Sequence, residues 1–191
     1  MLKILRLYYN YYLVKWQIRK VLPAYFINRI EIADCGERLI PYQGIFVRER
    51  VAEMLKKAQQ RLPPHFELKV LSGFRDDAEQ SALRKMFGNT QQVAAESGHA
   101  TGGAVDVILS HCGKEVDCGG KYLSFSSATP TWSRGLNRDQ RHWRFILYKA
   151  MTDAGFVNYP LEWWHFCYGD KMYAAYKFQR RAVYGKIHLP G

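Results

Sequence analysis

The chain has 191 residues, of which 48% are hydrophobic and 24% charged, values that favour one folded domain and exclude a disordered chain. No apolar run is long enough to predict a membrane-spanning helix. The formal net charge of +11 is explained by a solvated basic surface, or by contact with an anionic membrane or an acidic cell-wall polymer. No nucleic-acid-binding motif occurs, so we expect no nucleic-acid partner.

The chain begins with a basic and aromatic segment. We expect residues 1–30 to form a helical extension and residues 31–191 to form the main domain. Pro23 ends or bends the first predicted helix, because proline lacks a backbone donor and clashes with the preceding turn. The short apolar run at 7–14 is followed by basic residues and by no small-residue cleavage site, which argues against a secretory signal. We therefore expect a cytoplasmic location, with a periplasmic one left open, and possible membrane-surface contact through the basic ends.

Apolar periodicity predicts the remaining elements, with helical spacing in some segments and alternation in others. In chain order, we expect loops with short extended pieces over 24–46, a helix over 47–62, a strand over 67–72, a helix from Asp76 or Asp77 to about Phe87, a strand over 104–109, a helix over 137–154 ended by Gly155, a strand over 163–168, and a final helix near Lys171. Helices and strands do not alternate regularly. The predicted class is therefore α+β, a single domain with an antiparallel central sheet and packed helices.

The first segment that contains candidate metal-binding residues is Ser97-Gly-His-Ala-Thr-Gly-Gly-Ala-Val-Asp106. It places His99 and Asp106 on either side of a glycine turn. Asp106 lies inside an apolar strand, where a carboxylate is costly unless it is paired or binds a metal. By itself the segment is explained equally by a hydrogen-bonded structural pair and by a metal site.

The segment Glu162-Trp-Trp-His165 adds a second histidine and a second carboxylate. Residues three apart point to opposite faces of a straight strand, so both side chains reach one site only if the chain bends near Trp163. Together the two segments supply two histidines and one carboxylate, which is a ligand set of catalytic zinc, and leave Glu162 free as a base. The motif HExxH is absent, which excludes a thermolysin-like site.

These two motifs together resemble those of the zinc D-alanyl-D-alanine peptidases, which include the vancomycin-resistance dipeptidase and related D,D-carboxypeptidases. The run from Gly155 to Gly169 favours the dipeptidase branch. The resemblance covers roughly residues 35–176. It implies a zinc D-Ala-D-Ala peptidase (hedgehog-like) fold, a Zn²⁺ cofactor and a small peptide substrate, and it implies nothing about oligomeric state.

The resemblance also implies roles for individual residues. His99, Asp106 and His165 would be the zinc ligands. Glu162 would act as the catalytic base, taking a proton from zinc-activated water and passing it to the leaving amine.

Three further roles follow from the same resemblance. Arg75, in Ser-Gly-Phe-Arg, would be a catalytic residue that stabilises the oxyanion or orients the substrate. Ser97 would help to bind the carboxylate of the substrate, and Asp117 would meet its free amine. Asp76 follows Arg75 where the family usually has proline, and it could pair with that arginine. Cys118 replaces a methionine of the family, which is consistent with a tolerated packing change.

Two alternatives stay open for the function. The expected activity is hydrolysis of the dipeptide D-Ala-D-Ala, and the alternative is a D,D-carboxypeptidase or endopeptidase that acts on peptidoglycan stem peptides. A non-catalytic metal-binding module is disfavoured, because a structural site has no use for a free Glu162.

The four cysteines show no CxxC spacing, and we expect free thiols, although Cys112 and Cys118 could bridge in an oxidising compartment. Trp163 and Trp164 are expected in the core. Cys167 lies on the same strand face as His165, but three ligands are already present without it.

Overall fold

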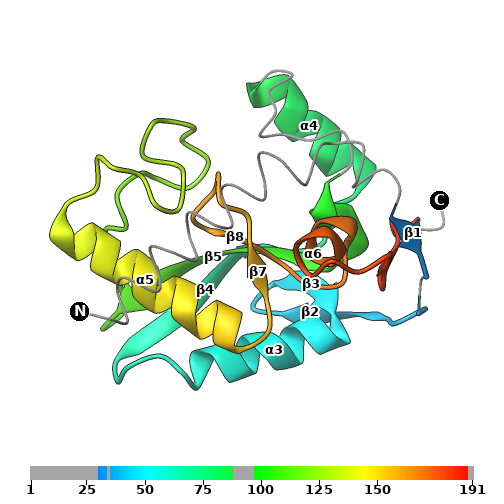
Figure 1. Ribbon diagram of the computed structural model, residues 1–191, viewed down its shortest axis with the longest axis horizontal. Helices are drawn as coiled ribbons and strands as arrows, with labels where there is room; N and C mark the ends of the chain where they lie inside the picture. The colour runs from blue at the N-terminus through cyan, green and yellow to red at the C-terminus, as the bar shows by residue number, and fades with distance from the viewer. Residues whose placement is uncertain (1–29, 34, 88–96, 189–191) are drawn as a thin grey trace.

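The computed structural model describes residues 30–33, 35–87 and 97–188, and an antiparallel sheet forms its centre (Figure 1). Four strands follow the order β4–β5–β8–β7, and β6 pairs with the end of β5. The strands are β4 (Phe66–Ser72), β5 (Ala104–His111), β6 (Lys114–Glu115), β7 (Val157–Asn158) and β8 (His165–Cys167). Every pairing in this sheet is antiparallel, which confirms the predicted α+β class.

Strand β5 is the most deeply buried element of the sheet. Every residue from Ala104 to Ser110 is buried. Strand β4 instead alternates, with Phe66, Leu68 and Val70 buried and the residues between them exposed. A strand that is covered on both faces holds few charged groups, so Asp106 in the middle of β5 needs partners of its own.

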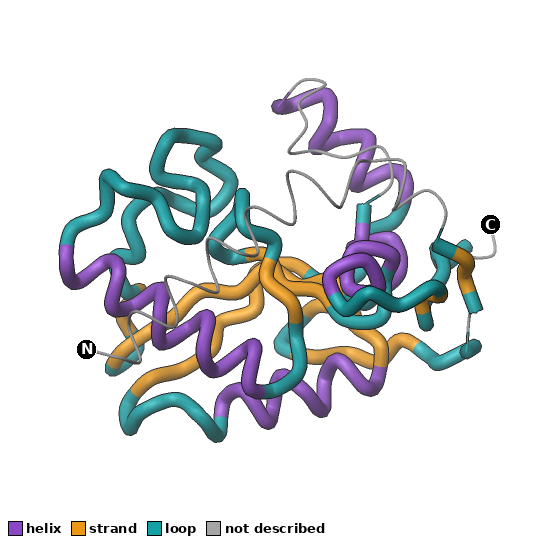
Figure 2. The backbone as a smooth tube through the Cα atoms, in the orientation of Figure 1, coloured by secondary structure: helices purple, strands orange, loops and turns teal. Residues whose placement is uncertain are grey.

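Two long helices, α3 (Glu49–Gln59) and α5 (Arg138–Asp153), pack against each other and against the sheet (Figure 2). Helix α5 begins with a capping box, in which the side chain of Asn137 accepts from the backbone of Gln140 and the Gln140 side chain accepts in return. It ends just before Gly155, whose φ of 108° favours a residue without a Cβ.

The described residues also form α4 (Asp77–Phe87), which is as long as α3, and two short segments, the 3₁₀ helix η1 (Gly98–Thr101) and α6 (Lys171–Tyr176). Helix α4 projects away from the sheet at the top of Figure 1. Within the described residues, no helix combines the length and the hydropathy needed to cross a membrane.

Two small strand pairs lie beside the main sheet. Strands β2 (Leu39–Tyr42) and β3 (Ile45–Arg48) form an antiparallel hairpin. Strands β1 (Glu31–Ile32) and β9 (Arg181–Ala182) pair in parallel and join segments from opposite ends of the described chain.

Most predicted elements are confirmed, among them the strand at 67–72, the helix from Asp77 to Phe87 and the helix at 137–154. The helix predicted over 47–62 begins later, at Glu49, because Val47 and Arg48 complete β3.

The strand predicted from Trp163 is wrong at its start. The chain turns there, and His165 donates its backbone N–H to the carbonyl of Glu162, so that β8 begins only at His165. This turn is the bend that a shared site for Glu162 and His165 requires. The predicted helical extension lies, except for Ile30, outside the described residues, and the boundary between 1–30 and 31–191 stays a prediction.

Candidate metal centre

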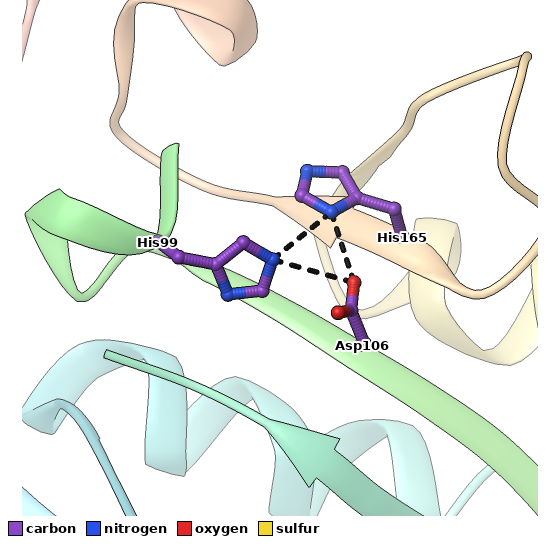
Figure 3. Close-up of side chains that lie close together, drawn as sticks. All are labelled: His99, Asp106 and His165. Carbon is purple, nitrogen blue, oxygen red and sulfur yellow. Dashed lines mark hydrogen bonds and ion pairs between the residues drawn. The ribbon is translucent and has the colours of Figure 1, made fainter. Parts of the chain in front are cut away.

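Three buried side chains from separate parts of the chain meet at the sheet (Figure 3). The distance between His99 Nε2 and His165 Nδ1 is 3.2 Å. Oδ1 of Asp106 lies 3.3 Å from His99 Nε2 and 3.0 Å from His165 Nδ1. Within the part of the chain that the structure describes, these residues form the one cluster of His, Cys, Asp and Glu able to hold a metal ion.

The register of the sheet places two members of this cluster. Asp106 of β5 is directly opposite His165 of β8, and on its other side it is opposite Ser72 of β4. His99 comes from η1, the short helix that leads into β5.

The Ser72-Gly-Phe-Arg75 segment forms two hydrogen bonds with His99. The ring nitrogen Nδ1 of His99 lies 2.7 Å from the carbonyl oxygen of Gly73, and the backbone N–H of Arg75 donates to the carbonyl of His99. A Cβ on Gly73 would overlap the carbonyl oxygen of Phe46, so the close packing of this segment against β3 requires glycine.

That contact determines the tautomer of His99. A carbonyl oxygen only accepts, so Nδ1 donates its proton to Gly73 and Nε2 presents a lone pair to the cluster. Burial lowers the pKa of His99, which keeps the ring neutral. Burial opposes the ionisation of Asp106, but the two histidines outweigh it and hold the pKa of Asp106 well below its usual range. The cluster therefore offers a neutral imidazole and a carboxylate at one point.

The three donor atoms fit a divalent cation such as zinc. Zinc–ligand bonds to nitrogen and oxygen are about 2.0–2.2 Å long, so two ligand atoms of a tetrahedral site lie roughly 3.3–3.6 Å apart. The observed separations of 3.0 to 3.3 Å are close to the edges of one face of such a site. Burial would lower the pKa of His165, but the hydrogen bond and charge of Asp106 outweigh burial and raise it. The hydrogen bond between His165 Nδ1 and Asp106 Oδ1 requires a proton, which a bound cation would replace.

Glu162 lies next to this cluster because of the turn before β8. The side-chain amide of Asn158 donates to the carbonyls of both Glu162 and His165, at 3.2 and 2.9 Å, and holds the two ends of the turn together. The side chain of Glu162 is buried, and its carboxyl is close enough to His165 and Asp106 to be affected by their charges. Burial raises the pKa of Glu162 to about 7. A carboxyl group with such a pKa is able both to accept and to release a proton near neutral pH.

Arg75 reaches the same site from the other side. Its Nη2 donates to Ser72 Oγ at 2.8 Å and lies 3.4 Å from Asp106 Oδ2, while its Nη1 donates to Gln80 Oε1 at 3.1 Å. Among the described residues, the neighbouring Asp76 forms no hydrogen bond or ion pair with this guanidinium. Its carboxylate instead accepts from the backbone N–H of Glu79 at the start of α4.

The two predicted substrate-binding residues both take part in local structure. Ser97 Oγ accepts from the backbone N–H of His99 and caps η1. Asp117 accepts from the backbone of Gly119 and from the side chain of Gln140, each at 2.8 to 2.9 Å. These contacts position both residues, and their roles towards a substrate stay predictions.

Tyr122 is the residue of the site that sequence reasoning missed. Its hydroxyl donates to Asp106 Oδ2 at 2.9 Å. It lies in the loop between β6 and α5, and no spacing or motif connects it with Asp106.

The tryptophans and cysteines are placed as expected. Trp163 and Trp164 are buried in the core. All four cysteines are free thiols, with Cys112 exposed and Cys118 buried. Cys167 does not belong to the metal-ligand cluster, and burial raises the pKa of its thiol well above the usual value.

The sheet and its cluster define an α+β protein with a buried group of two histidines and one aspartate that could hold a metal ion. The chain belongs to the D-ala-D-ala dipeptidase family, whose model matches residues 74–182 and so includes every residue predicted above as a ligand or a catalytic group.

Two curated relatives are both named D-alanyl-D-alanine dipeptidase. The chain is 34% identical over 105 residues to the protein from Synechocystis sp., a match to 49% of this chain and 42% of the relative. It is 30% identical over 83 residues to the protein from Enterococcus faecalis, a match to 42% of this chain and 41% of the relative. The matched region thus spans about two fifths of the length of these relatives.

Proposed function

We propose that this chain is a zinc-dependent D-alanyl-D-alanine dipeptidase. The observation that carries the proposal is the meeting of His99, Asp106 and His165 at one buried point, with Glu162 held next to them by the turn before β8. The membership of the chain in the D-ala-D-ala dipeptidase family, and the names of its relatives, support the same activity.

His99, Asp106 and His165 would hold the ion. Two neutral imidazoles and one carboxylate leave a net charge of +1 at a divalent cation, which preserves its ability to polarise other ligands. A bound zinc ion supplies Lewis-acid polarisation of the scissile carbonyl and lowers the pKa of a water molecule.

Glu162 is the proton carrier in this proposal. Burial favours the protonated form of its carboxyl group, so the carboxylate readily accepts a proton from the attacking water, and it then releases that proton to the leaving amine. Its burial keeps bulk water away from this transfer.

Arg75 supplies positive charge on the other side of the site. Ser72 and Gln80 hold its guanidinium in place, so the group is oriented before a substrate arrives. It stabilises the negative charge that develops on the carbonyl oxygen in the transition state. Ser97 is proposed to donate its O–H to the carboxylate of the dipeptide, because its oxygen accepts from His99 and its hydroxyl proton can still donate. Asp117 is proposed to accept from the amine of the dipeptide, since a carboxylate oxygen that already accepts one hydrogen bond retains a second lone pair.

A second candidate is a D,D-carboxypeptidase or endopeptidase that trims peptidoglycan stem peptides. The net charge of +11 favours it, because a basic protein is attracted to an acidic wall polymer.

The test is an assay of the zinc-loaded protein with D-Ala-D-Ala, L-Ala-L-Ala and a stem pentapeptide, followed by mass spectrometry. We expect release of D-alanine from D-Ala-D-Ala alone, and a loss of about 10²- to 10⁴-fold in the Glu162→Ala variant with its zinc content unchanged. A dipeptide with a blocked amine should resist a dipeptidase and be cleaved by a carboxypeptidase. Absence of any D-alanine release from the zinc-loaded protein would contradict the proposal.

A further inference from the structure

The two carboxylate oxygens of Asp106 have separate sets of neighbours. Oδ1 lies 3.3 Å from His99 and 3.0 Å from His165, on the side of the cluster. Oδ2 accepts from the hydroxyl of Tyr122 at 2.9 Å and lies 3.4 Å from Nη2 of Arg75. One oxygen therefore faces the ligand cluster, and the other is engaged by hydrogen-bond donors.

This division has a consequence for metal binding. A carboxylate coordinates a cation through one oxygen or through both, and the choice changes the number of ligands around the ion. A hydrogen bond to the second oxygen fixes the orientation of the group and keeps that oxygen away from the ion. Zinc sites in enzymes depend on this restraint, because a low number of protein ligands leaves coordination positions for water and substrate.

We infer that Tyr122 is a positioning residue that restricts Asp106 to coordination through Oδ1 and thereby strengthens metal binding. The inference rests on the metal site of the proposed function. It assigns to Tyr122 a role towards Asp106 and makes no claim of contact with the substrate.

Tyr122 is suited to this role because its surroundings keep it in place. Its ring packs edge-on against Trp164, with ring centroids 5.7 Å apart and an interplanar angle of 81°, and Trp164 is fully buried. Arg144 of α5 binds the loop on both sides of Tyr122, since it donates to the carbonyls of Cys118 and Ala128. The hydroxyl is therefore presented to Asp106 from an anchored loop.

Arg75 does not replace Tyr122 in this role. Its contact with Asp106 Oδ2, at 3.4 Å, is longer than the 2.8 Å hydrogen bond that the same Nη2 makes to Ser72. Under the proposed function the guanidinium, held by Ser72 and Gln80, also stabilises charge on the substrate. The hydroxyl of Tyr122, at 2.9 Å, is therefore the closer and more specific donor to Oδ2.

The test compares the wild type with Tyr122→Phe, which removes the hydroxyl and keeps the ring. We expect the zinc dissociation constant, measured by competition with a chelator, to rise about 10- to 100-fold. The protein loaded with Co²⁺ provides an independent readout, because the visible absorption of Co²⁺ weakens when its coordination number increases from four to five. We expect weaker absorption in Tyr122→Phe, since both oxygens of Asp106 become available.

Tyr148→Phe is the matched control, because Tyr148 of α5 packs against Trp132 and is not part of the cluster. It should leave the dissociation constant and the Co²⁺ spectrum as in the wild type. Equal zinc affinity and equal spectra in wild type and Tyr122→Phe would overturn the role of Tyr122 and leave the proposed function intact. A wild-type protein that binds neither ion would overturn the proposed function, and this inference with it.

Discussion

Asp106 and His165 face each other directly across strands β5 and β8, with their ligand atoms 3.0 Å apart. Side chains alternate between the faces of a sheet, so a shift of one residue in this register would turn one of the two away from the other. His99 reaches the same point through the separate element η1. The cluster therefore depends on correct strand pairing and forms only in the folded chain.

Metal binding should stabilise the fold, since the unfolded chain does not bring the three ligands together. Binding contributes about 2.7 kcal/mol when free zinc exceeds its dissociation constant 100-fold. Each kcal/mol raises the melting temperature of a chain of this size by roughly 2–4 °C. We expect saturating zinc to raise the melting temperature of chelator-treated protein by about 5–10 °C in calorimetry. The Asp106→Asn variant should show little of this shift. An equal shift in this variant would contradict the role of Asp106 as a zinc ligand.

Glu162 should make the metal-free protein less stable at high pH. Burial raises its pKa from 4.5 to about 7, so the folded state takes up a proton that the unfolded state has already lost. The cost is absent below pH 4.5, grows as the pH rises towards 7, and is complete above it. A difference of this size corresponds to about 2–4 kcal/mol.

The variant Glu162→Gln tests this dependence, since glutamine has nearly the same shape and does not ionise. With chelator present, its free energy of unfolding by urea should exceed that of the wild type at pH 8, and the difference should disappear near pH 4.5. A difference that stays constant between these two pH values would refute the explanation.

Arg144 should be among the most costly residues to replace. It is 1% exposed and donates hydrogen bonds to five backbone carbonyls of the loop between β6 and α5. Arg144→Ala leaves these carbonyls buried without a donor, and we expect a loss of about 3–5 kcal/mol in urea unfolding. Arg144→Lys should also destabilise, because a single ammonium group does not span five acceptors. The exposed Arg141 of the same helix is the control, and Arg141→Ala should change stability by less than about 0.5 kcal/mol.

Asp76 should matter for stability and not for catalysis. Its carboxylate accepts from the backbone of Glu79 at 2.8 Å, and the Glu79 side chain accepts from the backbone of Asp76 in return. Loss of such a cap costs about 0.5–2 kcal/mol, which we expect for Asp76→Ala in urea unfolding. The kcat for D-Ala-D-Ala hydrolysis should be unchanged within about twofold. A marked rise in kcat would instead show that Asp76 restrains Arg75.

Local elements were the most predictable part of the fold. The helix over 137–154 carries its own signals, since Asn137 caps its start and Gly155 follows its end. The strand over 67–72 shows the alternation of a half-buried strand. The start of β8 was predicted wrongly, because the aromatic residues Trp163 and Trp164 have high strand propensity, whereas the turn that begins at Pro160 continues through them.

The sequence by itself determined which residue types are available for chemistry. Two histidines and two acidic residues in two short motifs were enough to predict a metal site, since a carboxylate within an apolar strand needs a partner. Only the tertiary structure decided how these groups meet. The pairing of β5 with β8 sets Asp106 opposite His165, and the carbonyl of Gly73 sets the tautomer of His99. The contact of Tyr122 with Asp106 likewise depends on a loop that Arg144 anchors. Such contacts join residues far apart in the chain, and packing, which no local pattern records, brings them together.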